Sequence, residues 1–156
     1  MTKQYQQPHG RNLRLGRFSE QGRIYLVTTV TEERNPVFKD LISARFVIQS
    51  MRYFHESASL TSLAYVLMPD HLHWLLVLDG EYSLSYVMRR FKGYTSLGIN
   101  RLRQCSGRIW QSGYHDHALR REEDQLRLAR YIVANPLRAG LVERIEDYPH
   151  WDAMWL

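Results

Sequence analysis

Two histidines separated by a single residue stand inside a strongly apolar segment, HLHWLLVL. His71 and His73 alternate there with Leu72 and Trp74. Side chains two residues apart in a β-strand point to the same face, and their α-carbons lie about 7 Å apart. Two imidazoles at this separation can bind one metal ion, although two histidines with separate hydrogen-bond partners would show the same spacing. The pair is a candidate metal site.

A second pair of this kind follows later in the chain. His115 and His117 flank Asp116 in a shorter and more polar segment. An exposed polar strand explains this spacing better than a metal site does. Both histidines remain candidates for phosphate contacts or for supporting the first pair, and His117 or a water molecule is a candidate general base.

A tyrosine and an asparagine four residues apart end the last strongly helical segment. Tyr131 and Asn135 would share one helical face, and Arg127 continues that face one turn earlier. The neighbouring stripe is apolar and is expected to face the core: Leu126, Ala129, Ile132 and Val133. Tyr131 is therefore expected at the surface, and the amide oxygen of Asn135 suits Mg²⁺ or Mn²⁺. The alternative is a packing tyrosine and an asparagine that caps the helix before Pro136.

Tyr94 is the main rival nucleophile among the ten tyrosines. It lies on the apolar stripe of residues 83–103, and Gly98, four residues later, has no side chain that could bind a metal. Core packing is therefore predicted for Tyr94, and Tyr131 is preferred. A tyrosine hydroxyl is protonated at neutral pH, so it needs a base or a nearby cation to act as a nucleophile.

Hydrophobic periodicity predicts the elements that would position these residues. Residues 23–31, 61–68, 71–78 and 114–119 are predicted strands, and the middle two form a hairpin through residues 68–70. Residues 39–56 and 83–103 have helical spacing. The side chains expected to face inward are Leu41, Ala44, Ile48, Met51 and Phe54 in the first helix, and Leu84, Val87, Met88, Phe91 and Tyr94 in the second. A third helix is expected to begin near Asp124 and to stop at Asn135-Pro136.

This order of elements predicts an α+β fold of the ferredoxin-like type. Its β-α-β-β-α-β unit would form an antiparallel sheet with helices on one face, followed by a C-terminal helix that carries Tyr131. We expect one domain over residues 1–156, with a basic arm at 1–22, the core and catalytic helix at 23–135, and a tail at 136–156. The tail residues Tyr148, Trp151 and Trp155 are expected to pack back on the body.

Composition favours a globular, cytoplasmic protein with a polyanionic partner. The 156 residues are 44% hydrophobic and carry a formal net charge of +5, which favours nucleic acid but proves nothing about the fold. Cys105 is the only cysteine, so an internal disulfide and a thiolate zinc cluster are excluded. We expect neither a signal peptide nor a membrane span, because no apolar run is long enough.

Both motifs together resemble a known family. His71-Leu72-His73, within YVLMPDHLHWLLVL, resembles the histidine-hydrophobic-histidine (HUH) motif, and IWQSGYHDHALRREEDQLRLARYIVANPLRAGLV resembles the second signature of single-tyrosine HUH transposases. The branch that the chain resembles most is that of the REP-associated tyrosine transposases, relatives of the insertion-sequence 200/605 enzymes. The resemblance covers residues 11–152.

The resemblance implies a ferredoxin-like core and an enzyme of DNA transposition and recombination. By position, Tyr131 matches the nucleophile that attacks single-stranded DNA and forms a 5′-phosphotyrosine bond, leaving a free 3′-hydroxyl. His71, His73 and Asn135 match the ligands of a divalent metal, Mg²⁺ or Mn²⁺; most insertion-sequence enzymes carry glutamine at the third place. Hairpins of repetitive extragenic palindromes (REP) are the implied partner. The REP-associated branch implies a monomer, and the insertion-sequence relatives a homodimer.

Arginine-rich segments supply candidate contacts to DNA phosphates. These candidates are Arg11, Arg14, Arg17, Arg89, Arg90, Lys92, Arg101, Arg103, His117 and Arg127. Two other functions fit the same residues: a non-catalytic nucleic-acid-binding protein of ferredoxin-like fold, and a metal-dependent hydrolase that forms no covalent bond to DNA.

Overall fold

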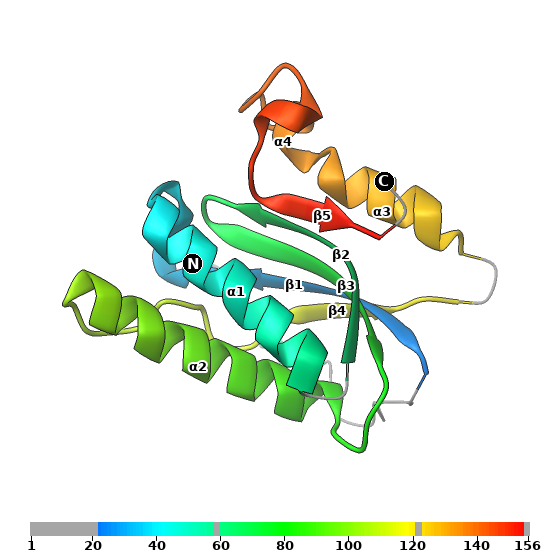
Figure 1. Cartoon of the computed structure of the whole chain (residues 1–156), viewed down its shortest axis with the longest axis horizontal. Helices are drawn as coiled ribbons and strands as arrows, with labels where there is room; N and C mark the ends of the chain where they lie inside the picture. Colours follow the sequence, from blue (N-terminus) through cyan, green and yellow to red (C-terminus); the bar gives the residue numbers. More distant parts are fainter. Residues whose placement is uncertain (1–21, 58–59, 121–122, 155–156) are drawn as a thin grey trace, which may run out of the picture.

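The computed structural model describes residues 22–57, 60–120 and 123–154 of the chain. Five strands form one antiparallel sheet in the order β4-β1-β3-β2-β5 (Figure 1). The strands are β1 (Ile24–Val30), β2 (Leu60–Met68), β3 (His71–Leu78), β4 (His115–Ala118) and β5 (Trp151–Ala153). The α-helices are α1 (Leu41–Ser57), α2 (Leu84–Arg103), α3 (Gln125–Val133) and α4 (Asn135–Arg138), and short 3-10 turns occur at Glu32–Arg34, Val37–Lys39 and Ile145–Asp147. The predicted ferredoxin-like α+β fold is confirmed.

The sheet separates two hydrophobic cores because its central strand, β3, is buried on both faces. Leu72, Trp74 and Leu76 face the core that α1 and α2 cover. Leu75 faces the second core, where α3 contributes Ile132 and Val133. Side chains alternate along a strand, so His71 and His73 share the α3 side with Leu75. Figure 1 shows α1 and α2 together on one side and α3 on the other. Helix α3 therefore lies over the face of the sheet that carries His71 and His73.

The buried stripe of α1 differs from the predicted one at its start. Leu41 is 47% exposed, which corrects its assignment to the core, whereas Ala44, Met51 and Phe54 are buried as predicted. Val47 and two serines complete the buried face. Serine can be buried here because its hydroxyl bonds within the helix, as Ser50 Oγ does to the carbonyl oxygen of Phe46 at 2.7 Å. A prediction based on the spacing of apolar residues therefore does not select such serines.

Tyr94 also departs from its predicted place. The other four predicted residues of α2 are buried, but Tyr94 is 48% exposed. Its ring stacks against Phe46 and Tyr53, with centroids 5.7 and 5.9 Å apart. Tyr94 therefore packs in an aromatic cluster at the outer surface of α1 and α2 rather than in the core.

The tail contributes a strand that the sequence analysis missed. Residues Trp151–Ala153 form β5, and Ala153 pairs with Ala64 of β2. The expected packing of the tail is seen at Tyr148, whose hydroxyl donates to the carbonyl oxygen of Leu67 at 2.5 Å, and at the half-buried Trp151; Trp155 lies outside the described residues. A three-residue strand is too short to show a period of two, and its pairing is non-local.

In the part of the chain that the structure describes, no helix is long and apolar enough to span a membrane.

Candidate active site

The two histidines of β3 lie side by side on the α3 face of the sheet. The ring centroids of His71 and His73 are 4.9 Å apart, and the ring planes are inclined by 80°. Both residues are partly buried. The alternation of β3 thus places the rings together, as the sequence predicts.

A hydrogen bond holds each ring by its Nδ1 atom. His73 Nδ1 lies 2.8 Å from Oγ1 of Thr28, its direct neighbour on β1, and His71 Nδ1 donates to Oδ1 of Asp70 at 2.6 Å. Among the described residues, nothing hydrogen-bonds to either Nε2 atom. Partners at the second ring nitrogen fix the orientation of metal-binding histidines in proteins. The contacts of Thr28 and Asp70 with the two histidines were not predicted from the sequence.

The pKa values of His73 and Asp70 both lie below the ordinary values of these side chains. Burial, then the charges of His71 and Arg138, lower the pKa of His73 to about 4. Burial opposes ionisation of Asp70, but hydrogen bonds from His71 and Arg34 outweigh it and lower the pKa of this carboxyl. His73 is therefore neutral at physiological pH, the state that can bind a metal ion, and Asp70 is a carboxylate that accepts from His71.

Helix α3 presents Tyr131 to solvent while its opposite side packs on the sheet. Its N-terminus is capped by Asp124, whose side chain accepts from the backbone N–H groups of Leu126 and Arg127. Ala129 and Ile132 are buried, and Tyr131 is 60% exposed, as the predicted stripe requires. A surface phenol of this kind is accessible to a large substrate.

Arg138 connects this tyrosine to the histidine pair. Its guanidinium carbon lies 3.9 Å from the centroid of the Tyr131 ring, a close cation-π contact. The charge of Arg138 also acts on the partly buried imidazole of His73. One guanidinium therefore lies against the phenol, and its charge also acts on His73. Arg138 was not among the residues predicted for the site, because helical spacing alone does not show that its side chain folds back.

Helix α3 ends at Val133, next to the predicted stop at Asn135-Pro136, and a separate short helix, α4, begins at Asn135. Pro136 occupies the first turn of α4, where a missing N–H group breaks no hydrogen bond. Asn135 is partly buried, and its backbone oxygen accepts from Ala139 at 2.9 Å. Its amide side chain has no hydrogen bond to any described residue.

The side chains of His71, His73 and Asn135 carry donor atoms of the types that bind divalent metal ions. The imidazoles of His71 and His73 are hydrogen-bonded at Nδ1 and have no described partner at Nε2, and Asn135, the first residue of α4, carries an amide oxygen. Within residues 22–57, 60–120 and 123–154, no group of three His, Cys, Asp or Glu side chains could hold a metal. A third ligand from these residues would then be of another type, such as the amide oxygen of Asn135. Imidazole nitrogen and amide oxygen ligands suit Mn²⁺. Mg²⁺ would be suited if the remaining ligands were oxygen atoms.

The second histidine pair lies on strand β4, at the edge of the sheet. His115 and His117 are both exposed, and His117 Nε2 lies 2.9 Å from the carboxylate of Glu123. Thr28 pairs with His115 on one side and with His73 on the other, so the three side chains form a row across the α3 face. His115, rather than His117, is therefore the one aligned with the candidate site. Only the strand register reveals this.

Five of the seven candidate phosphate contacts that the structure describes lie away from the histidine pair. Arg89, Arg90, Lys92, Arg101 and Arg103 belong to α2, on the opposite side of the sheet. The Lys92 ammonium donates to the backbone oxygens of Gln111 and Gly113, which ties down the loop before β4. Arg127 is exposed on α3, one turn before Tyr131. Arg11, Arg14 and Arg17 lie outside the described residues.

The rival tyrosines are less suited to attack a phosphate at this site. Tyr94 lies on the α1 and α2 side of the sheet. Tyr148 is on the α3 side, but its hydroxyl already donates to Leu67, and burial together with the charge of Asp70 raises its pKa to about 12. Tyr131 is the exposed phenol with a cation against its ring.

The chain belongs to the family described as Transposase IS200 like, whose model matches residues 21–135. It is 26% identical over 139 residues to a Haemophilus influenzae protein provisionally named a REP-associated tyrosine transposase, covering 83% of this chain and 78% of that protein. It is 29% identical over 89 residues to a REP-associated tyrosine transposase of Escherichia coli, covering 55% of this chain and 50% of that one. A solved structure of a REP-associated tyrosine transposase bound to a REP hairpin has the same fold, with a TM-score of 0.74 at 21% identity over 86% of this chain and 79% of that one.

Proposed function

We propose that this chain cleaves and rejoins single-stranded DNA through a covalent bond to Tyr131. One observation carries the proposal: the exposed phenol of Tyr131 lies under the guanidinium of Arg138, whose charge also acts on His73. Membership of the transposase family supports it. The nucleophile, a cation and a metal-binding pair would thus act on one phosphate.

The covalent step conserves the phosphodiester bond. The Tyr131 oxygen attacks the scissile phosphorus, its proton passes to water, and an Oη–P bond forms as the P–O3′ bond breaks. The departing 3′ oxygen takes up a proton and becomes a 3′-hydroxyl. When a second 3′-hydroxyl attacks the phosphotyrosine, the DNA strand is rejoined and the phenol is released. No nucleotide triphosphate is needed, because one phosphoester replaces another.

The chain's own residues orient and neutralise charge in this step. Arg138 would fix the phenol ring by stacking and would offset the negative charge on the phosphoryl oxygens. Thr28 and Asp70 hold the imidazoles of His73 and His71 with their Nε2 atoms available. Mg²⁺ or Mn²⁺ bound by His71, His73 and Asn135 would supply Lewis-acid polarisation of the phosphate.

The DNA partner that we propose is a hairpin of a repetitive extragenic palindrome. Two relatives carry the name of REP-associated tyrosine transposases, and the solved structure of the same fold holds a REP hairpin. The net charge of +5 favours a polyanion. The reaction would then transpose or process DNA at such hairpins.

A covalent-adduct gel tests the proposal. A single-stranded hairpin labelled at its 3′ end is incubated with the protein and Mg²⁺ or Mn²⁺. A slower, denaturation-resistant band is expected, because Tyr131 stays attached to the 5′ phosphate of the labelled fragment. Tyr131→Phe should abolish this band while hairpin binding stays near normal. Tyr94→Phe, the matched control on the other side of the sheet, should keep it.

Two other results would contradict the proposal. Cleavage by Tyr131→Phe would show that water is the nucleophile and that the chain is a hydrolase. Tight hairpin binding without cleavage in either metal would show a non-catalytic DNA-binding protein.

A further inference from the structure

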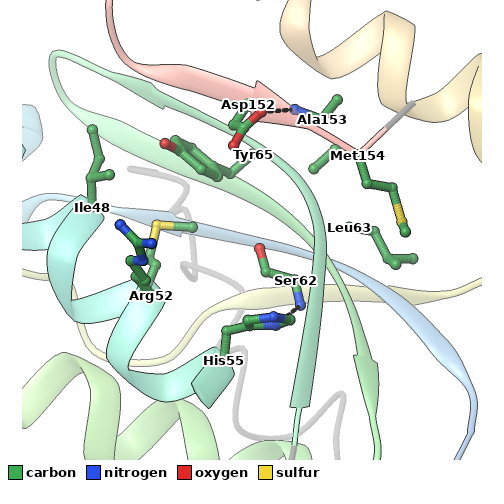
Figure 2. A pocket seen from close by; sticks show the side chains of 11 residues that line it. Ile48, Arg52, His55, Ser62, Leu63, Tyr65, Asp152, Ala153 and Met154 are labelled. Atoms are coloured by element: carbon green, nitrogen blue, oxygen red, sulfur yellow. Dashed lines mark hydrogen bonds between the residues drawn. The ribbon is translucent and has the colours of Figure 1, made fainter. Parts of the chain in front are cut away.

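A cavity of about 450 Å³ lies between α1 and the β2–β5 edge of the sheet, away from the histidine pair (Figure 2). Val66 pairs with both His73 and Trp151, so these three side chains point to the α3 side. The next residues along β2 and β5, Tyr65 and Asp152, point to the α1 side instead. The proposed strand-transfer reaction uses none of the residues that line this cavity.

The floor of the cavity combines an aromatic ring with a carboxylate. Tyr65 and Asp152 are direct cross-strand neighbours. Asp152 is exposed, and one of its oxygens accepts from the backbone N–H of Ala153 at 2.8 Å. Burial, then the charge of Asp152, raise the pKa of Tyr65 to about 12, so the phenol stays protonated. The floor thus offers a flat π-surface beside an anionic acceptor.

The wall of the cavity supplies N–H donors from α1. Arg52 Nε lies 3.3 Å from the Glu56 carboxylate, but both side chains are exposed, so this pair is weak and the terminal guanidinium nitrogens can bind a ligand. His55 accepts at Nδ1 from the backbone N–H of Ser62, at 3.0 Å. A neutral imidazole with this bond carries its proton on Nε2 and donates there. Figure 2 shows Arg52 and His55 on α1, facing the strand that carries Ser62 and Tyr65.

We propose that this cavity binds an unpaired guanine base of the DNA substrate, with Asp152 and Arg52 reading its two polar edges. Guanine alone among the four bases has two adjacent N–H donors on its Watson–Crick edge, which match one carboxylate. Its O6 and N7 acceptors match an arginine. Adenine and cytosine place a ring-nitrogen acceptor beside their amino group, and thymine has a single N–H between two carbonyls. The π-face of the base would stack on Tyr65. This inference rests on DNA being the substrate, as proposed above.

Binding to short oligonucleotides tests the proposal without cleavage. The Tyr131→Phe chain is titrated, without metal, into fluorescein-labelled oligothymidine that has one central guanine or one central adenine. Fluorescence anisotropy is expected to show at least about fivefold tighter binding of the guanine strand, the lower end of a bidentate contact. Hypoxanthine, which lacks the N2 amino group, should bind with intermediate affinity.

Exposed carboxylates offer a matched pair of variants. Asp152→Asn keeps the bond to Ala153 but replaces one acceptor oxygen by an amide, so the guanine preference should disappear. Asp147→Asn, an exposed acid of the 3-10 turn Ile145–Asp147, makes the same charge change elsewhere and should keep it. Arg52→Met should weaken binding of the guanine strand more than binding of the adenine strand.

Three results would overturn the inference: no guanine preference, an unchanged preference in Asp152→Asn, or free dGMP binding as tightly as the strand. The last would assign the cavity to a free nucleotide instead of DNA. The adduct gel reports separately on Tyr131. An adduct without guanine preference would refute only the cavity assignment, and guanine preference without an adduct would refute only the strand-transfer chemistry.

Discussion

Replacing His73 with glutamine should reduce the amount by which the free energy of unfolding decreases as the pH falls. The pKa of His73 falls from the ordinary 6.5 to about 4 in the folded chain, chiefly through burial. Between these two values the unfolded chain binds a proton that the folded chain does not, so the free energy of unfolding decreases as pH falls from about 6.5 to about 4. Above 6.5 both states are neutral and the contribution is constant. Glutamine has no proton to bind and can still hydrogen-bond to Thr28.

The size of this effect follows from the two pKa values. Between pH 7.5 and pH 5, His73 should account for about 2 kcal/mol of lost stability in the metal-free protein. Urea unfolding with a chelator at both pH values measures it in the native chain and in His73→Gln. The difference between the two chains isolates His73, because the remaining groups titrate in both.

His115→Gln serves as the control, since it removes an exposed imidazole from the same row of the sheet. It keeps His73, so the loss of stability that His73 contributes between the two pH values should remain. Equal losses in the native chain and in His73→Gln would refute the reasoning, because His73 would then titrate alike in the folded and unfolded states.

Substitutions at three further positions test Arg138 of α4 and two glycines of α2. Arg138→Met should slow adduct formation about 100-fold at saturating DNA, and Arg138→Lys should slow it less, because the charge beside Tyr131 is retained; unchanged single-turnover rates in Arg138→Met would exclude a role for this residue. In α2, Gly93 has open space where a Cβ would lie, so Gly93→Ala should stabilise the chain by about 0.5–1 kcal/mol. Gly98→Ala would place its Cβ 2.1 Å from the ring of Phe46 and should destabilise by about 1–3 kcal/mol in urea unfolding, a contrast that is lost if both variants shift stability the same way.

Elements with a strong period could be read from the sequence, and elements set by distant contacts could not. The β2–β3 hairpin and α2 were predicted almost to the residue, because their apolar patterns are long and regular. The three-residue β5 has no such pattern and exists through its pairing with β2. Tyr94 was misplaced because periodicity counts an aromatic ring as core, whether it is buried or stacked at the surface.

The same distinction between local patterns and distant contacts applies to the residues of the candidate site. The alternation of β3 was enough to pair His71 with His73, and the apolar stripe of α3 was enough to expose Tyr131. Thr28 could not be found, since its contact with His73 depends on the register between β1 and β3, which are 45 residues apart at this point. Residues that hold a site in place are thus less visible in sequence than the residues that they hold.

Arg138 is the clearest case, and its position depends on the break between α3 and α4. In one continuous helix, α-carbons seven residues apart would be separated by about 10 Å along the axis. Ala134, with ψ at 0°, ends α3, and Pro136 starts α4 afresh, so the guanidinium of Arg138 comes to lie 3.9 Å from the ring of Tyr131. The proline that marks the end of α3 in the sequence is therefore part of what brings a cation to Tyr131, the proposed nucleophile.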